Sequence, residues 1–223
     1  EGIELQYDAL LNGKNHIWMM PRDALNREIV MGEGPFEKED HYRNIILTVD
    51  KHIQHIVEAE LGRSVQKWGA KGGIAIAMEP MTRRVLAIAS YPSFNPNHFI
   101  QYRPGAWRNR AISDVFEPGS LFKVFLAATA LEERVVSLAD SFFCENGVYK
   151  VYDRTIHDHS KHGWLNFQQI IKFSSNIGAS KVAEKIGKER FYQYISAFGF
   201  GEKTQIGLPG EAKGIVHHPR YWS

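Results

Sequence analysis

A Pro-Gly pair at residues 118–119 precedes a run that contains neither glycine nor proline, SLFKVFLAATALEE, from Ser120 to Glu133. Proline and glycine interrupt helices, whereas this run consists largely of good helix formers, so the sequence predicts a helix that begins at Ser120. Positions three apart share one face of a helix. We therefore expect the side chains of Ser120 and Lys123 to lie next to each other at a helix start.

This serine and lysine have the chemistry of a nucleophile beside its base. A serine hydroxyl becomes a strong nucleophile when another group takes its proton, and a lysine can do so when burial or nearby cations lower its pKa from about 10.4. The flanking Phe122, Val124 and Phe125 favour a dry setting, and the free N–H groups of a first helical turn can bind an oxyanion. Taken alone, however, Ser-x-x-Lys more often marks an ordinary helix start with a capping serine and a solvated lysine.

A second polar element, SSN at residues 174–176, separates two apolar segments of helical character. Ser174 and Asn176 stand two apart in a short loop, where both side chains can project into one cleft, the serine to relay a proton and the asparagine to bind a substrate amide. By itself the tripeptide is more typical of a polar helix cap. Ser-x-x-Lys followed by Ser-x-Asn is, however, the motif order of penicillin-binding proteins and class A β-lactamases. The two elements together favour a reactive serine.

Apolar periodicity predicts the other elements. Apolar residues recur at three- and four-residue intervals over 53–68, which predicts a helix capped by Thr48 or Asp50. The stretches GGIAIAME and RRVLAIASY, joined by the turn PMTR, predict a buried strand hairpin. The stretch up to about Asn44 has little periodicity, and GEGPFEKEDH is typical of a solvated connector. Further helices are expected near 166–173, 177–186 and 188–198.

Composition and charge exclude several classes of protein. A formal net charge of +2, with Lys and Arg scattered among acidic residues, argues against nucleic acid as a partner. The longest apolar stretch, VFLAATAL, is far shorter than the roughly 18 residues of a membrane-spanning helix. Cys144 is the single cysteine, so the chain has no internal disulfide and no cysteine-based zinc site. We expect Cys144 to be a small core residue.

Four stretches together resemble a known family: RNRAISDVFEPGSLFK, KFSSNIGASKVAEKIG, FGFGEKTQIGLPGE and the upstream GIELQYDALLNGK. They are similar to the class B penicillin-binding proteins, and most of all to the cell-division peptidoglycan transpeptidase. The resemblance implies an α/β (α+β) fold of the penicillin-binding transpeptidase and serine β-lactamase type, with helices around an antiparallel sheet. It also implies that residues 1–46 are the end of a pedestal domain and a connector, and that residues 47–223 are the N-terminal part of the transpeptidase domain.

The same resemblance implies a role for each matching residue. Ser120 would attack the D-Ala-D-Ala carbonyl of a peptidoglycan stem peptide, or the ring of a β-lactam, and form an acyl-enzyme. Lys123 would accept its proton, Ser174 would pass a proton toward the leaving amine, and Asn176 would hold the backbone of the donor peptide. No metal or organic cofactor is implied. The parent protein would be anchored in the cytoplasmic membrane, with this portion on the periplasmic side, among division-machinery proteins.

The chain departs from the family pattern at the third motif, Lys-Thr/Ser-Gly, which the sequence does not contain. Lys203-Thr204-Gln205 is rejected as that motif because glycine permits a close backbone approach that glutamine would obstruct. The resemblance implies that the true motif lies beyond Ser223, so we expect the polypeptide to be a truncated fragment with little or no transpeptidase activity. The incomplete sheet would expose an edge that invites self-association. Leu121 replaces a hydroxyl residue that is usual in the family.

The sequence leaves three alternatives open. In the stretch IHDHSKHGW, the residues His157, Asp158, His159 and His162 are all credible metal ligands, although a solvated polar loop is the favoured interpretation. A serine hydrolase of the same fold, a β-lactamase or carboxypeptidase, would use water in place of the acceptor amine. A non-catalytic module would instead sense β-lactams, or would bind division partners through residues 1–44.

Overall fold

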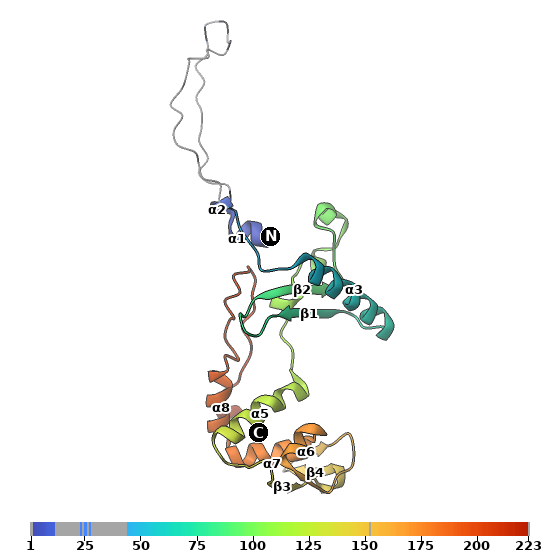
Figure 1. Cartoon of the computed structure of the whole chain (residues 1–223), viewed down its shortest axis with the longest axis vertical. Helices are drawn as coiled ribbons and strands as arrows, with labels where there is room; N and C mark the ends of the chain where they lie inside the picture. The colour runs from blue at the N-terminus through green and yellow to red at the C-terminus, as the bar shows by residue number, and fades with distance from the viewer. Residues whose placement is uncertain are drawn as a thin grey trace. The chain divides into compact units, whose positions relative to one another are not determined.

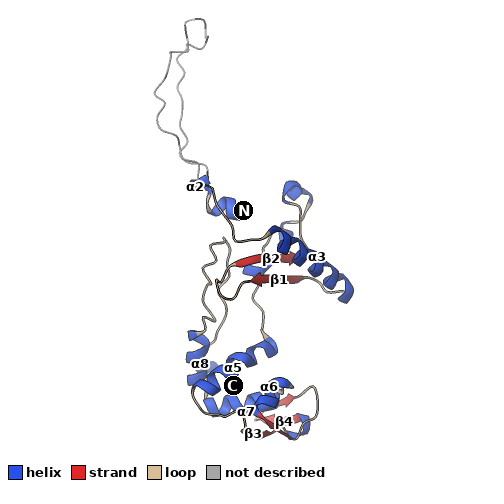
Figure 2. Ribbon diagram, in the orientation of Figure 1, coloured by secondary structure: helices blue, strands red, loops and turns tan. Residues whose placement is uncertain are grey.

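The computed structural model of the chain describes residues 2–11, 23, 25, 27, 44–151 and 153–222. Two compact units are described separately: a first unit of Glu1–Asp114 and Gln205–Glu211, and a second unit of Val115–Thr204 and Ala212–Ser223. Each combines helices with antiparallel strand pairs (Figures 1 and 2). The connector stretch GEGPFEKEDH lies outside the described residues. The division into a connector of residues 1–46 and a domain of residues 47–223 stays a prediction.

The centre of the first unit is one long helix packed against a strand hairpin. Helix α3 (Lys51–Trp68) begins at Asp50, whose carboxylate accepts the backbone N–H groups of His52 and Ile53. Strands β1 (Gly73–Met78) and β2 (Val85–Tyr91) pair antiparallel, and α3 packs against both (Figure 1). The predicted helix, its Asp50 cap and the predicted hairpin are confirmed.

Small residues let α3 and the hairpin approach closely. Ala87 and Ala89 of β2 are buried, and a Cβ atom on Gly73 of β1 would lie 2.8 Å from Leu61 Cδ1. The Gln54 side chain of α3 accepts the backbone N–H of Ile88 at 2.8 Å and donates to its carbonyl at 2.9 Å. These bonds satisfy backbone groups of β2 that would otherwise form an open strand edge.

The rest of the first unit consists of short elements. The loop expected after the hairpin contains two 3₁₀ turns, and its Trp107 indole N–H donates to the Phe99 carbonyl at 3.0 Å. The short elements are α1 (Ile3–Gln6), α2 (Asp8–Leu11), η1 (Pro96–Gln101), η2 (Pro104–Ala106) and α4 (Arg110–Ser113).

The second unit is mainly helical, with two small strand pairs. Its helices are α5 (Lys123–Glu132), α6 (Phe167–Lys172), α7 (Asn176–Ile186) and α8 (Lys188–Ala197). Strand β3 (Ser141–Phe143) pairs with β6 (Trp164–Asn166), and β4 (Val148–Val151) pairs with β5 (Arg154–His157), both antiparallel. The 3₁₀ turns are η3 (Gly119–Phe122), η4 (Glu145–Gly147) and η5 (Pro219–Tyr221). The four predicted helices of this unit are therefore present, and Lys203-Thr204-Gln205 lies in no strand.

One apolar core joins α5, α6 and α7. Phe167 and Ile170 of α6 pack with Ile177 of α7, and all three side chains are buried. A Cβ atom on Gly178 would lie 2.6 Å from Ile170 Cγ1, so α6 and α7 touch where α7 has no side chain. Cys144 is fully buried in the same core, as expected, and burial raises the pKa of its thiol. The core meets the SSN loop at Ser175, whose hydroxyl lies 3.5 Å from Cys144 Sγ.

The predicted helix at Ser120 differs from the structure at its start. Residues Gly119–Phe122 form the 3₁₀ turn η3, and the α-helix begins at Lys123. Tight 3₁₀ turns are frequent at helix N-termini. Gly119, the first residue of η3, has a left-handed φ of 60°, which glycine adopts easily. Ser120 and Lys123 consequently lie on adjoining turns of different type.

Candidate active site

The four residues predicted from the sequence meet at one ammonium group. Lys123 Nζ lies 3.4 Å from Ser120 Oγ and 3.0 Å from Ser174 Oγ, and it donates at 2.6 Å to both the Ser174 carbonyl and Asn176 Oδ1. Ser120 makes no capping bond, so the alternative of a capping serine beside a solvated lysine is wrong. We call Ser120, Lys123, Asp158, Ser174 and Asn176 the Lys123 cluster.

The surroundings of Lys123 destabilise its charged form relative to a lysine in water. The side chain is partly buried, and this desolvation is the larger effect, which lowers the pKa of the amine below its ordinary value of 10.5. The negative charge of Asp158 acts in the opposite direction and raises the pKa of Lys123. Because desolvation prevails, Lys123 loses its proton more readily than a solvated lysine does.

The turn that carries Ser120 is anchored by aromatic packing. The rings of Phe122 and Phe125 lie 5.2 Å and 4.8 Å from the ring of Phe200, measured between centroids. Val124 is exposed and contributes nothing to a dry setting, contrary to the expectation for that residue. Ser120 itself is exposed, so its hydroxyl is open to a reactant while the turn behind it is fixed.

The two serines of the SSN loop make different hydrogen bonds. Ser174 follows α6 with φ of 54°, a left-handed conformation that is uncommon outside glycine, and it turns both its carbonyl and its hydroxyl toward Lys123. Ser175 is buried and caps α7, because its hydroxyl accepts the Gly178 N–H at 2.9 Å. The cap interpretation of the tripeptide therefore holds for its middle residue, whereas Ser174 faces the lysine.

The Asn176 side chain is bonded at both ends. Its Oδ1 accepts from Lys123, and its Nδ2 donates to the His157 carbonyl at 2.8 Å. The residue is nevertheless exposed, so its amide group can be reached from solvent. In this arrangement Asn176 orients the lysine, a contact that the sequence did not predict.

The sequence pattern indicates a role for Asp158 only as a metal ligand. In the structure its Oδ2 accepts the Ser175 hydroxyl at 2.6 Å, and its Oδ1 accepts the backbone N–H groups of Asn176 at 2.5 Å and Ile177 at 3.0 Å. His162 instead stacks on Phe173, with ring centroids 5.0 Å apart. Within the described ranges, no group of three or more His, Cys, Asp or Glu side chains is arranged to hold a metal ion. No periodicity links Asp158 to a helix that begins eighteen residues later, so the pattern gave no signal for this contact.

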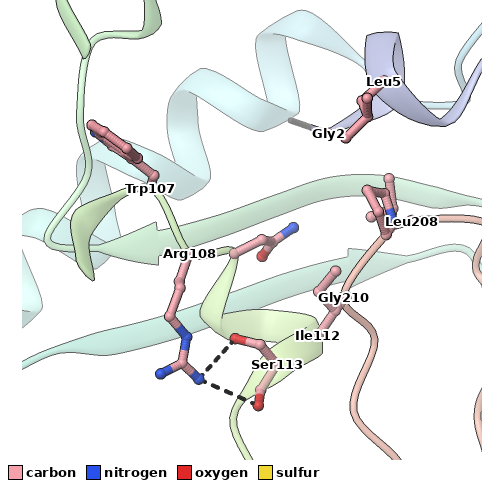
Figure 3. A pocket seen from close by; sticks show the side chains of 10 residues that line it. Gly2, Leu5, Trp107, Arg108, Ile112, Ser113, Leu208 and Gly210 are labelled. Carbon is pink, nitrogen blue, oxygen red and sulfur yellow. Dashed lines mark hydrogen bonds between the residues drawn. The ribbon is translucent and has the colours of Figure 1, made fainter. Parts of the chain in front are cut away.

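A pocket of about 430 Å³ lies in the first unit, and none of the predicted site residues lines it (Figure 3). It is lined by Trp107, Ile112 and Leu208 among others, and the Arg108 guanidinium at its edge donates to the Ser113 hydroxyl and carbonyl. The same guanidinium forms an ion pair with Asp114 at 2.8 Å. This pocket holds no pair of a nucleophile and a base.

Comparison with known proteins shows which family the chain belongs to. A family model described as the penicillin binding protein transpeptidase domain matches residues 73–223. The chain belongs to the penicillin-binding protein transpeptidase family. The family prediction is thereby confirmed.

Individual relatives agree with this transpeptidase assignment. The whole chain aligns at 34% identity with "Probable peptidoglycan D,D-transpeptidase PbpC" of Pseudomonas aeruginosa and at 33% with "Peptidoglycan D,D-transpeptidase FtsI" of Escherichia coli, covering 39% and 37% of those proteins. The transpeptidase domain of Burkholderia pseudomallei penicillin-binding protein 3 superposes with a TM-score of 0.70 at 32% identity, over 79% of this chain and 49% of that one. The predicted mixed α/β transpeptidase fold is confirmed.

The chain spans less than half the length of the PbpC and FtsI relatives. In the part of the chain that the structure describes, none of the helices combines the length and the hydropathy of a membrane span.

Proposed function

We propose that this chain carries the serine nucleophile of a peptidoglycan D,D-transpeptidase of class B, of the type that cross-links stem peptides during septal wall synthesis. The observation that carries the proposal is the position of Lys123 Nζ, which lies between the hydroxyls of Ser120 and Ser174. The lowered pKa of this amine supports a role as the base. The proposal for this chain is confined to the serine, the lysine and the SSN loop.

In the first half of the reaction, the neutral amine of Lys123 takes the proton of Ser120 while Oγ forms a bond to the carbonyl carbon of the penultimate D-Ala. A neutral amine has two N–H donors, which match the two acceptors at 2.6 Å, Ser174 O and Asn176 Oδ1, and it keeps a lone pair for a hydroxyl. The bond from that carbon to the terminal D-Ala nitrogen then breaks. Ser174 passes the proton from Lys123 to the leaving amine.

In the second half, the amine of a neighbouring stem peptide attacks the ester on Ser120, and the serine oxygen leaves with a proton returned from the attacking amine. A β-lactam enters the first half in the same way, but its leaving nitrogen stays tethered in the opened ring. The result is a stable acyl-enzyme on Ser120. This makes β-lactams ligands of the same site.

Fluorescent penicillin labelling of the full-length protein tests the proposal. We expect the protein to be labelled and the Ser120→Ala variant to lose the label, while Ser141→Ala, which changes an exposed serine of the same unit, keeps it. Label that persists in Ser120→Ala, or that is absent from the unmodified protein, contradicts the proposal and favours a non-catalytic module. Rapid release of the label as penicilloic acid favours a serine hydrolase instead.

The proposal extends to location and partners. A transpeptidase of this type works on the outer side of the cytoplasmic membrane, beside its stem-peptide substrate and the division machinery. Strand β1 pairs with β2 alone among the described strands, which supports self-association through its other edge. Sedimentation velocity over a range of concentrations checks this last point, and a single unchanging monomer boundary contradicts it.

A further inference from the structure

We propose that Asp158 is a positioning residue for the Lys123 cluster: it holds the start of α7 and the SSN loop so that Ser174 and Asn176 present their oxygens to Lys123 Nζ. This inference rests on the proposed function, in which Lys123 is the base for Ser120. Asp158 lies outside both the Ser-x-x-Lys motif and the Ser-x-Asn motif.

The carboxylate of Asp158 binds three consecutive residues at the helix start. Its Oδ1 accepts the N–H groups of Asn176 and Ile177, which no carbonyl of the preceding turn can satisfy, and its Oδ2 accepts the Ser175 hydroxyl. Ser175 in turn accepts the Gly178 N–H. The aspartate, reaching across from the end of β5, therefore fixes the first turn of α7 through both its oxygens.

Holding this turn also fixes the residue before it. Ser174 has the left-handed φ of 54°, which costs conformational energy outside glycine and persists only where its surroundings determine it. On one side Ser174 follows the end of α6, and on the other Ser175 is tied to Asp158. The carbonyl and hydroxyl of Ser174 consequently meet Lys123 Nζ at 2.6 Å and 3.0 Å.

The charge of Asp158 has a second, opposing effect on the lysine. It raises the pKa of Lys123, against the larger lowering by burial. An uncharged residue of the same shape should therefore lower the pKa of Lys123 further, and the neutral amine would form at lower pH. Loss of the hydrogen bonds of Asp158 should therefore slow acylation, whereas loss of its charge alone should lower the pKa of Lys123.

The elements around Asp158 carry other titratable groups. Cys144, at the end of β3, lies 3.5 Å from the Ser175 hydroxyl, and its thiol has a pKa raised by burial. Lys181 of α7 forms an ion pair with Glu145 at 2.6 Å, and its charge is therefore balanced locally. His157 and His159 flank Asp158 in sequence, and both are exposed.

Two variants of the full-length protein separate the effects. Asp158→Asn keeps the shape and removes the charge, whereas Asp158→Ala removes both. We expect Asp158→Ala to lower the rate of penicillin acylation by about 100-fold, because small misplacements of reacting groups cost factors of this size. We expect Asp158→Asn to shift the acid limb of the acylation pH profile to lower pH. Asp140→Asn, at a carboxylate that bonds to Ser137 instead, is the matched control and should leave the profile unchanged.

A measurement that needs no activity keeps this inference distinct from the proposed function. Competitive labelling with acetic anhydride over a pH range, read by peptide mass spectrometry, reports the protonation of Lys123 directly. A lower pKa of Lys123 in Asp158→Asn, with faster hydrogen exchange at Asn176 and Ile177 in Asp158→Ala, supports the inference even if Ser120 is never acylated. An unchanged lysine pKa and unchanged exchange overturn it, even if penicillin labelling succeeds.

Discussion

The α3 hairpin layer of the first unit and the Lys123 cluster of the second unit are stabilised by different means. In the hairpin layer, small apolar residues such as Ala87 and Ala89 are buried, and among the described residues the buried side-chain oxygen without a hydrogen-bond partner, Ser90 Oγ, also lies in this layer. In the Lys123 cluster, the partly buried Lys123 Nζ bonds to three oxygens within 3.0 Å. Burying a charge is costly unless it is bonded, so this second arrangement depends on every partner being in place.

The two regions should therefore respond differently to substitution. Substitutions in the hairpin layer should change stability in proportion to the carbon they remove. Substitutions in the Lys123 cluster should change reactivity far more than stability, because the cluster lies near the surface above a separate apolar core. Four substitutions test this contrast between reactivity and stability.

The largest effect is expected for Lys123→Ala. It removes the proposed base, and general base catalysis typically contributes about 10²- to 10⁴-fold to a rate. We expect penicillin acylation to fall by a factor of this size, measured by stopped-flow quenching or gel fluorescence, with little change in the melting temperature. The exposed Lys150→Ala of β4 is the control. A fall in stability that accounts for the lost acylation would erase the contrast.

The next effect is on stability alone. Phe167 is 1% exposed in the core of the second unit, and Phe→Ala substitutions in cores cost about 3–5 kcal/mol. The counterpart in the hairpin layer is Val65→Ala, which removes two buried carbons at roughly 0.8 kcal/mol each. Urea unfolding should show this order. Equal losses at both positions would mean that the two cores are packed alike.

A smaller loss is expected where two helices touch. Gly178→Ala places a methyl group 2.6 Å from Ile170, and such overpacking costs about 1–3 kcal/mol. Gly105→Ala in the first unit meets no atom within 4 Å and should be close to neutral. Thermal unfolding of both variants checks the difference, and a neutral Gly178→Ala would show that α6 and α7 can separate without cost.

The smallest effect is expected at the edge of β2. Gln54→Ala leaves the N–H and carbonyl of Ile88 without their side-chain partners, a loss of about 1–2 kcal/mol for a partly buried pair. Gln66→Ala, at an exposed position of the same helix, serves as control. If the two variants unfold at the same urea concentration, the Gln54 bonds contribute nothing to the hairpin layer.

The contrast also explains what the sequence could predict. The helix at 51–68 and the hairpin follow from apolar periodicity and turn residues, and they are present with the Asp50 cap. Ser120, Lys123, Ser174 and Asn176 were found because their order along the chain matches a family. Asp158 was missed as a member of the site because its bonds to Asn176 and Ile177 form only when β5 and α7 come together in the fold. Contacts of this kind produce no periodic pattern in the sequence. The 3₁₀ turn at Ser120 was missed because the residues of that turn favour an α-helix as well.

In the proposed reaction Ser120, and not Ser174 across the lysine, is the reactive hydroxyl. The most direct measurement is peptide mapping of the penicillin-treated full-length protein by tandem mass spectrometry, since Ser120 and Ser174 both contact Lys123 Nζ and fall in different peptides. We expect a penicilloyl adduct on Ser120. An adduct on Ser174, or a protein left unmodified at both serines, would contradict it.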